Sequence, residues 1–302
     1  MLRVLSAIPT LLLVIVAAFA MVRAAPGGPF DDERVLPPET AENLRAAYHL
    51  DEALPLQFWR YLAGLAQGDF GPSYFYRDYD VDELIGAALP VSALLGFLAM
   101  VLALGIGVAA GIAAALRPNT LADRLISGFA MTGISVPVFV VAPVLVLGFA
   151  IGLGWLPASW SGGDAGARLL LPVIALALPQ IAFITRLTRG SMIEVLGSDY
   201  IRTARAQGLG TLTVIRCHAL KPALLPVVSY LGPAIAGVLT GAVVVETIFG
   251  IPGLGQLFVK SGLNRDYTLV LGIVVFYAAL IIVLNLVVDL LYRLMDPRIG
   301  AG

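Results

Sequence analysis

The chain has 302 residues, of which 59% are hydrophobic and 13% charged, and its mean hydropathy is +0.91. Soluble domains are roughly 45–50% apolar and about 25% charged, so this composition excludes a water-soluble globular protein and indicates an integral membrane protein. The formal net charge of -1 gives no indication of nucleic-acid binding, and the single cysteine, Cys217, excludes an intrachain disulfide.

Six apolar runs are long enough to cross a bilayer, since about 20 apolar residues in a helix span roughly 30 Å of hydrocarbon. They cover approximately 4–22, 89–116, 125–153, 169–187, 223–245 and 269–291. None alternates over about ten residues, as the strand of a membrane barrel would. We therefore expect an all-α integral membrane protein with six transmembrane helices. Residues 1–88 would hold the first helix and an extracytoplasmic segment, and 89–302 a core domain of five helices.

The first run also has features of a secretory signal peptide. Arg3 precedes it, and small residues follow near 20–25. The run is long for a signal peptide and five further spans follow it, so a retained first helix is the simpler interpretation.

Lys and Arg near the ends of the spans predict the orientation of the chain. One set of ends and loops carries Arg3, Arg117, Arg124, Arg186, Arg189, Arg202, Arg205, Arg216, Lys221, Arg293 and Arg298. The opposite short loops carry few basic residues, and the segment 25–88 is mostly acidic and rich in aromatic residues. We expect both termini and the loop 190–222 to be cytoplasmic, and 25–88 to lie outside.

Proline and glycine interrupt most of the spans. Prolines lie at positions 9, 90, 137, 143, 172, 179, 226 and 233, where each should kink or break a helix. Two GxxxG patterns, at 107–111 and 148–152, predict close packing between helices. Glu246 ends the fifth run, and an acid at that depth is either functional or a carboxylate reaching water at the interface.

Several kinds of chemistry have no residues to support them. There is no GxxxxGK[ST] loop for ATP phosphates, no metal-ligand spacing and no pair of carboxylates suited to catalysis. The stretch around Ser135 resembles the serine motif of rhomboid proteases, but His49 and His218 are expected outside the spans and on opposite sides of the membrane. We therefore predict that the chain is not an enzyme and that it holds no cofactor or metal.

The loop between the fourth and fifth spans is short, basic and predicted to be helical. Good helix formers follow Asp199, which can cap a helix start, as can Ser198. Gly208 is suited to the position just beyond the helix end, and 211–220 can form a second helix. A compact helical loop of this kind could insert into a groove of a partner protein or lie on anionic lipid headgroups.

This loop resembles the cytoplasmic EAA loop of ABC importer permeases, whose pattern is Glu-Ala-Ala, three residues and Gly. Here Arg202, Thr203 and Ala204 precede Gly208 by the same spacing, and a Leu-Lys-Pro sequence follows at 220–222. Further stretches are similar to the dipeptide/oligopeptide branch of the family, and they are spread over the whole chain. They are PGGP at 26–29, QFWRYLAGLAQGDFGPSY at 57–74, ALP at 88–90, ISVP at 134–137, GAVVVETIFGIPGLGQL at 241–257, RDY at 265–267 and MDPR at 295–298.

The resemblance implies a type I ABC importer permease fold and a role as one of two homologous permease subunits. The partners implied are a second permease, two cytoplasmic ATPase subunits or domains that bind ATP and magnesium, an extracytoplasmic substrate-binding protein, and membrane lipid. The residues that match the loop that couples to the ATPase are Asp199, Tyr200, Ile201, Arg202, Thr203, Ala204, Arg205, Ala206 and Gly208. Glu246, Phe249 and Pro252 would belong to an outer gate or path. Arg202 and Thr203 stand where the family pattern has Glu and Ala, so the sequence leaves open whether the contacts that depend on that Glu are made here.

The sequence leaves the transported solute open. Di- and oligopeptides are expected from the branch that the chain resembles, and nickel, haem or another small solute are the alternatives within the family. A self-contained secondary transporter or channel is the alternative from a different class of protein. The apolar runs contain no series of acidic or histidine residues for ion coupling, which argues against a proton- or sodium-driven carrier.

Overall fold

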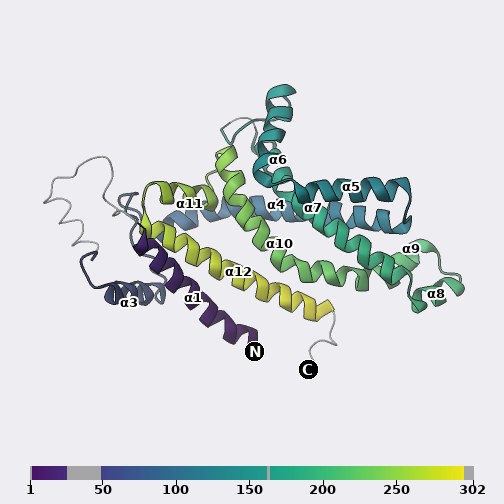
Figure 1. The fold of residues 1–302 in the computed structure, drawn as a ribbon, viewed down its shortest axis with the longest axis horizontal. Coiled ribbons are helices and arrows are strands. Elements are labelled where there is room, and N and C mark those ends of the chain that lie inside the picture. Colours follow the sequence, from purple (N-terminus) through teal and green to yellow (C-terminus); the bar gives the residue numbers. More distant parts are fainter. Residues whose placement is uncertain (1, 26–48, 162–163, 296–302) are drawn as a thin grey trace. The chain divides into compact units, whose positions relative to one another are not determined.

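The computed structural model describes residues 2–25, 49–161 and 164–295 (Figure 1). Within these ranges the regular structure is helical, apart from one isolated bridge between Pro72 and Asp80. The PGGP motif, most of the MDPR motif and part of the acidic segment 25–88 lie outside the described residues.

Helices account for most of the described chain. In chain order they are α1 (Leu2–Ala24), α3 (Leu54–Leu65), α4 (Val81–Leu116), α5 (Leu121–Ser135), α6 (Val138–Leu145), the π-helix η1 (Val146–Gly152), α7 (Ala165–Leu196), α8 (Asp199–Ala206), α9 (Thr211–Thr213), the π-helix η2 (Val214–Ala219), α10 (Leu220–Phe249), α11 (Leu254–Leu263) and α12 (Tyr267–Met295). Within the described residues, five stretches of helix are long and apolar enough to cross a membrane, or up to six if one bent pair of helices counts as a span. The expected all-α membrane protein is confirmed.

The bent pair corresponds to the third apolar run, which is not one straight helix. Helix α5 ends at Ser135, and the next helix, α6, begins at Val138. The two helical parts of the run are bent by 106° relative to each other. Val136 is extended because the residue before a proline is forced out of the helical region, and Pro137 follows it. The other intramembrane prolines lie within continuous helices; Pro172 and Pro179 in α7 are examples.

The chain divides into two compact units, each built from segments that are distant in sequence. Unit 1 comprises residues 1–91 and 252–282, and unit 2 comprises 92–251 and 283–302. Helices α4 and α12 contribute to both units. The sequence-based division at residue 88 groups 252–282 with the core domain, whereas the contacts group it with the N-terminal segment.

Unit 1 is built around α12, which buries residues on two opposite faces. Leu269 and Ile273 pack against α4 and α11, in a cluster with Val81, Ile85, Ala88 and Leu254. Leu271 and Val275 pack against Ile15, Ala18 and Phe19 of α1, with side chains of α3 alongside. The two pairs have the i, i+4 spacing of one helical face each, so the same helix holds two layers together.

The start of α12 is capped by a buried carboxylate, that of Asp266. It accepts hydrogen bonds from the Leu269 amide (3.2 Å), the Ser73 hydroxyl (2.5 Å) and the Tyr74 amide (3.1 Å). A carboxylate at this position satisfies an amide that the first turn of a helix leaves free. The same group therefore starts α12 and fixes the loop that precedes α4, which gives a physical reason for the RDY stretch at 265–267.

Unit 2 is built around α7, which packs against α5, α6 and α10. The expected close packing at 107–111 is present. A Cβ placed on Gly107 would lie 2.8 Å from Cβ of Ile184, and one on Gly111 would lie 2.5 Å from Cβ of Thr188. The second GxxxG pattern lies in η1, where a Cβ on Gly148 would meet nothing within 4 Å, so within the described part of this chain the pattern does not pack two helices together.

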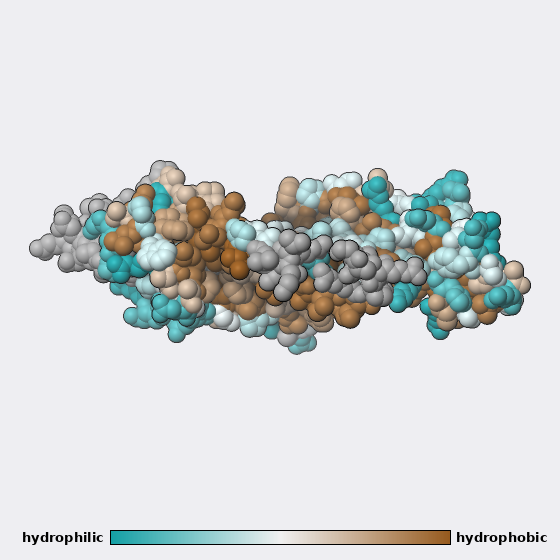
Figure 2. Space-filling view, turned by 90° about the horizontal axis from the view of Figure 1, so that it is seen from below, coloured by the Kyte–Doolittle hydropathy of each residue, from teal (hydrophilic) through white to brown (hydrophobic). Residues whose placement is uncertain are grey.

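Many large apolar side chains remain exposed on the membrane-length helices. Phe97 is 66% exposed, Phe129 68% and Ile151 68%. On the face shown in Figure 2, apolar residues form wide exposed areas between hydrophilic ones. Lipid or another membrane protein must cover such areas, since they are far larger than the scattered apolar residues of a soluble protein surface.

Candidate functional site

The predicted functional loop forms a compact helical connection between α7 and α10. Helix α8 follows a short break at Gly197 and Ser198, and α9 with η2 leads directly into α10. The expected helix-turn-helix is confirmed. The expected capping is wrong: the Ser198 hydroxyl donates back to the Val195 carbonyl (2.6 Å), and no side chain caps the start of α8. Asp199 instead pairs with Arg202 on the exposed surface, at 2.6 Å.

The end of α8 is closed by a left-handed residue, as expected for Gly208. Its φ is +81°, and its amide donates to the Arg205 carbonyl (3.0 Å). The next amide, of Leu209, donates to the Ala204 carbonyl (3.3 Å). These two bonds are those of a Schellman motif, which stops a helix sharply and satisfies its last carbonyls.

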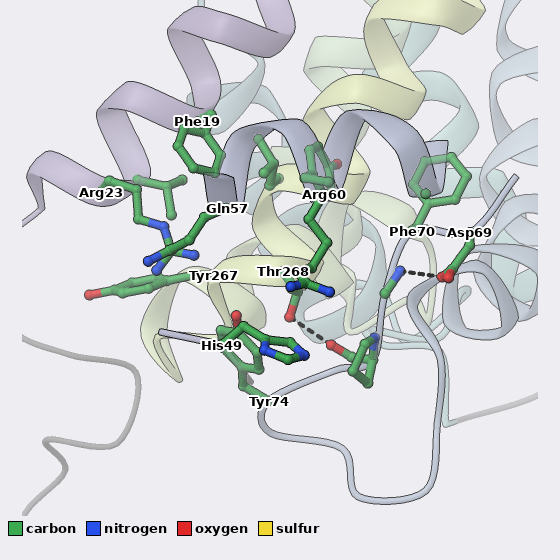
Figure 3. A pocket seen from close by; sticks show the side chains of 16 residues that line it. Phe19, Arg23, His49, Gln57, Arg60, Asp69, Phe70, Tyr74, Tyr267 and Thr268 are labelled. Carbon is green, nitrogen blue, oxygen red and sulfur yellow. Dashed lines mark hydrogen bonds between the residues drawn. The ribbon is translucent and has the colours of Figure 1, made fainter. Parts of the chain in front are cut away.

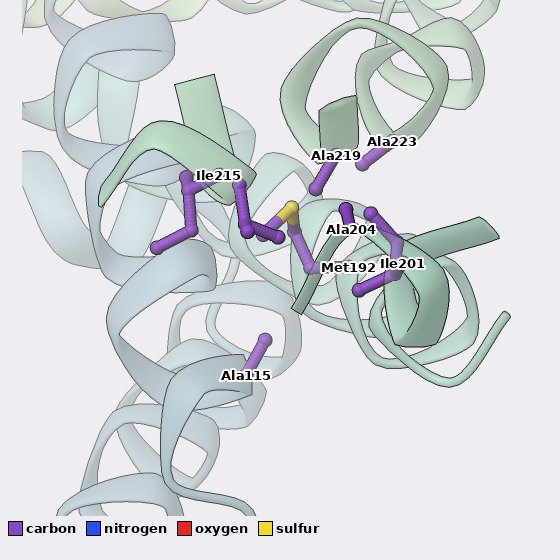
Figure 4. Close-up of a cluster of buried hydrophobic side chains, with 8 residues drawn as sticks. Ala115, Met192, Ile201, Ala204, Ile215, Ala219 and Ala223 are labelled. Carbon is purple, nitrogen blue, oxygen red and sulfur yellow. The ribbon is translucent and has the colours of Figure 1, made fainter. Parts of the chain in front are cut away.

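Helix α8 belongs to unit 2, and one of its faces is buried against other helices of that unit (Figure 4). Ile201 is fully buried and Ala204 is 6% exposed. The residues that surround them form a cluster, here called the α8 cluster: Ala115, Met192, Ile201, Ala204, Val214, Ile215, Ala219 and Ala223. Burying a side chain such as that of Ile201 contributes roughly 1.5–3 kcal/mol, so α8 is attached to the body of the unit rather than hanging from it.

The other predicted residues of the loop are exposed. They are Asp199, Tyr200, Arg202, Thr203, Arg205, Ala206 and Gly208. Ile201 and Ala204 thus support the helix from within, while the surface available to another molecule consists of polar and basic side chains with Tyr200, which is 49% exposed. The sequence pattern alone did not separate these two roles.

A buried ion pair joins α5 to α7 in the same unit, and the sequence analysis did not identify it. Arg189 donates from Nε to Oδ1 of Asp123 (2.5 Å) and from Nη2 to Oδ2 (2.8 Å). The carboxylate also accepts the Asn119 amide (2.8 Å) and the Ser127 hydroxyl (3.3 Å). Asp123 is only 3% exposed, and a bidentate geometry of this kind fixes the relative position of two helices. The sequence does contain an indication of this pair, because Asp123 lies at the start of one apolar run and Arg189 lies near the end of the next.

The residues predicted for an outer gate lie in different environments. Glu246 is fully buried near the end of α10 and accepts a hydrogen bond from the Ser92 hydroxyl of α4 (2.6 Å). The interpretation of Glu246 as a carboxylate with its head in water is therefore wrong. Phe249 is also buried, and its carbonyl accepts the Trp160 amide (2.9 Å). Pro252 is exposed and belongs to unit 1.

The end of α10 resembles the end of α8 in its backbone. Gly250 is left-handed, with a φ of +66°, and the Ile251 amide donates to the Glu246 carbonyl (2.8 Å). The chain therefore turns sharply after Phe249, before α11 begins at Leu254. Among the described residues, no group of three or more His, Cys, Asp or Glu side chains could hold a metal ion.

Comparison with known proteins places this architecture in a family. Residues 107–301 match the model of the binding-protein-dependent transport system inner membrane component. The chain is 56% identical over 297 residues to the oligopeptide transport system permease protein OppB of Salmonella typhimurium, an alignment that covers 98% of this chain and 97% of OppB. It is 42% identical to the dipeptide transport system permease protein DppB of Bacillus subtilis, over 96% of this chain and 94% of DppB.

A solved structure shows the same fold. A chain of the MetNI methionine ABC transporter in an inward-facing conformation superposes with a TM-score of 0.55, at 17% identity, over 70% of this chain and 96% of that one. The likeness at this identity concerns the fold alone.

The chain is therefore a multi-pass membrane permease with the fold of ABC importer permeases. It belongs to the family of binding-protein-dependent transport system inner membrane components. The resemblance to the dipeptide/oligopeptide branch that the sequence motifs indicated is confirmed.

Proposed function

We propose that this chain is the permease subunit of an ATP-driven importer for di- or oligopeptides. The named roles of the relatives support the cargo, since OppB and DppB are peptide transport permeases and align with nearly the whole chain. A second homologous permease, two cytoplasmic ATPase subunits and an extracytoplasmic binding protein complete the transporter. ATP and magnesium are bound by the ATPase subunits, and this chain carries no cofactor and performs no hydrolysis.

The observation that carries the mechanism is the division of α8 into two faces. Ile201 and Ala204 attach the helix to the α8 cluster, and the exposed face is available to an ATPase. Closure of the ATPase subunits on ATP moves the exposed face, and the buried face transmits the movement to α7 and α10. ATP can shift the equilibrium between inward- and outward-facing states only by its different affinity for the two.

The gate is assigned to the end of α10. The carboxylate of Glu246, held by Ser92, and the sharp turn after Phe249 fix this end of the helix. Pro252, just beyond the turn, begins the connection to α11. In the proposed transporter these residues line or close the outer end of the path.

Site-directed crosslinking tests the coupling role. Because Cys217 is exposed and lies close to α8 in sequence, it must first be replaced by serine. In that background, Arg202→Cys should crosslink to an ATPase subunit of the assembled transporter. Phe129→Cys, on an exposed apolar surface of α5, should not. Absence of any Arg202→Cys crosslink to an ATPase, or solute uptake by the purified chain alone, would contradict the proposal.

Uptake measurements test the cargo. Vesicles with the reconstituted complex are given di- to octapeptides, nickel and haem in parallel. ATP-dependent uptake of peptides is expected, and uptake of nickel or haem in its place would assign a different solute within the same family.

A further inference from the structure

A pocket of about 240 Å³ opens in unit 1, away from the residues discussed above (Figure 3). Side chains from the end of α1, from α3, from the loop before α4 and from the first turn of α12 line it. Its volume is below the roughly 300–1,000 Å³ of pockets that enclose a whole drug-sized ligand. It is therefore suited to one group of a larger molecule.

Two arginines, Arg23 and Arg60, belong to the lining of the pocket, and so does His49. Glu52 pairs with Arg60, since its Oε1 lies 2.7 Å from Nη2 of Arg60, and the same oxygen lies 3.1 Å from Nδ1 of His49. Arg23 lies over the ring of Phe19, 5.4 Å from its centroid, and pairs with no carboxylate among the described residues. The guanidinium of Arg23 is thus the charge that an anionic ligand would neutralise. One acidic residue, Asp69, also lines the pocket, and its Oδ1 accepts the Gly71 amide (2.7 Å).

Two buried polar atoms of the lining have no hydrogen-bond partner within the described part of the chain. Gln57 is 7% exposed, and its Nε2 donates to the Leu50 and Glu52 carbonyls at 3.0 and 2.7 Å, which holds the amide in one orientation and leaves Oε1 without a donor. The Tyr61 hydroxyl is the second such atom. A phenol is protonated at neutral pH, and burial raises the pKa of Tyr61 further, so its hydroxyl is a hydrogen-bond donor. Buried polar atoms of this kind are rare in folded proteins unless a ligand or water meets them.

The pocket continues into an apolar surface of α1. Leu12, Val16, Phe19 and Arg23 follow one another at helical spacing, so they share one face. Leu12 is 44% exposed and Val16 48%. Both α1 and α12 are candidate membrane spans, and the pocket lies where α1 ends and α12 begins. It therefore lies at the headgroup level of one leaflet, whichever way the chain is inserted.

We propose that this pocket binds the headgroup of a membrane phospholipid. The phosphate accepts hydrogen bonds from the Arg23 guanidinium and the Tyr61 hydroxyl, and a hydroxyl or ammonium group of the headgroup donates to Oε1 of Gln57. An acyl chain lies along Leu12 and Val16. Arginine suits this role because its planar guanidinium binds phosphate through two parallel hydrogen bonds and is less strongly hydrated than an ammonium group.

Native mass spectrometry of the full-length chain tests this site. The protein is reconstituted in vesicles of phosphatidylethanolamine and phosphatidylglycerol, extracted into detergent, and the retained phospholipid is measured. Wild-type protein should retain phospholipid, and Arg23→Gln should lower the apparent affinity roughly tenfold or more, because it removes the charge and the paired hydrogen bonds of the guanidinium. Arg77→Gln is the matched control, because Arg77 is exposed and does not line the pocket.

A second variant and a competition experiment distinguish phospholipid binding from a loss of stability and from binding of a soluble anion. Tyr61→Phe removes only the buried hydroxyl and should also weaken retention, with an unchanged thermal midpoint. Excess inorganic phosphate should not displace the lipid, because it lacks the acyl chain. Equal retention by Arg23→Gln and Arg77→Gln would overturn the proposal. Displacement by inorganic phosphate would overturn it as well, since it would indicate a site for a soluble anion.

Discussion

Gly208 has a backbone conformation that other residues adopt only at a cost. With its φ of +81°, a residue with a Cβ is strained by about 1–2 kcal/mol, although nothing lies within 4 Å of the position where a Cβ would be. The requirement is therefore purely conformational. It comes from the Schellman motif that ends α8 and turns the chain toward α9.

Two substitutions at Gly208 should distinguish the effect of its backbone conformation from the effect of adding a side chain. Gly208→Val should destabilise the end of α8 and uncouple ATP hydrolysis from uptake, while membrane insertion remains normal. Gly208→Asn is the control, because asparagine tolerates the left-handed region. ATPase activity and uptake of the reconstituted complex are measured together, and normal uptake by Gly208→Val would count against the coupling role.

The Asp123–Arg189 pair shows how single residues fix helices within a membrane protein. The Arg189 side chain is 31% exposed and that of Asp123 only 4%, so the carboxylate depends on its partners for solvation. Removing Arg189 would leave this buried carboxylate without its charged partner, which is costly. The pair therefore fixes α5 to α7 in a single arrangement, and its arginine directly follows Thr188, which contacts Gly111.

At the scale of the element, α8 offers a pair of alanines that differ in burial. Ala204 is 6% exposed within the α8 cluster, whereas Ala206 is exposed, two residues along the same helix. Ala204→Asp places a charged carboxylate among the apolar side chains of the α8 cluster, which is costly, and should detach α8 from the other helices of unit 2. Ala206→Asp should leave the helix attached.

Crosslinking measures this difference. In the Cys217→Ser, Arg202→Cys background, Ala204→Asp should reduce the crosslink to the ATPase and abolish uptake, and Ala206→Asp should retain both to a large extent. Equal effects of the two substitutions would show that burial of Ala204 is not what holds the helix.

The contact between α4 and α7 provides a second matched pair. A Cβ at Gly111 would lie 2.7 Å from the Thr185 carbonyl oxygen, so the neighbouring backbone must move, whereas one at Gly105 of the same helix would meet nothing within 4 Å. Gly111→Val should cost roughly 1–3 kcal/mol through overpacking and lower the thermal midpoint of the detergent-solubilised protein. Gly105→Val should leave that midpoint nearly unchanged, and a similar fall for both variants would refute the packing explanation.

For the whole molecule, the orientation of the chain in the membrane is a prediction from the distribution of basic residues. The single cysteine makes it testable, because Cys217 is exposed in the loop that is expected to be cytoplasmic. A membrane-impermeant thiol reagent should label Cys217 in inside-out vesicles and not in intact spheroplasts.

The opposite side is tested with a second variant. In the Cys217→Ser background, Tyr79→Cys introduces a thiol at an exposed position in the segment expected outside. It should be labelled in spheroplasts. Labelling of Cys217 in spheroplasts would reverse the predicted orientation.

The amino-acid sequence alone indicated that this protein lies in a membrane, where its long apolar runs are, and which loop between them is basic and helical. These follow from composition and periodicity, since hydrocarbon demands long apolar helices and charged residues such as Arg202 and Arg205 cannot continue one. The position of Gly208 just beyond the end of a helix could also be predicted, because a left-handed helix end favours glycine whatever surrounds it. The family followed from motifs spread along the chain.

Which residues contact one another follows from the three-dimensional structure and not from the sequence pattern. The tertiary structure buried Ile201 and Ala204 and exposed their neighbours, because the position of a short helix on the body depends on helices far away in sequence. It joined Asp123 to Arg189 across 66 residues, and it set the angle, 106°, of the bend that Pro137 predicts in the third apolar run. In a chain where most residues are apolar, hydrophobic pattern cannot distinguish a face that packs on protein from one that faces lipid, so these contacts are decided by shape and by the few polar groups that must find partners.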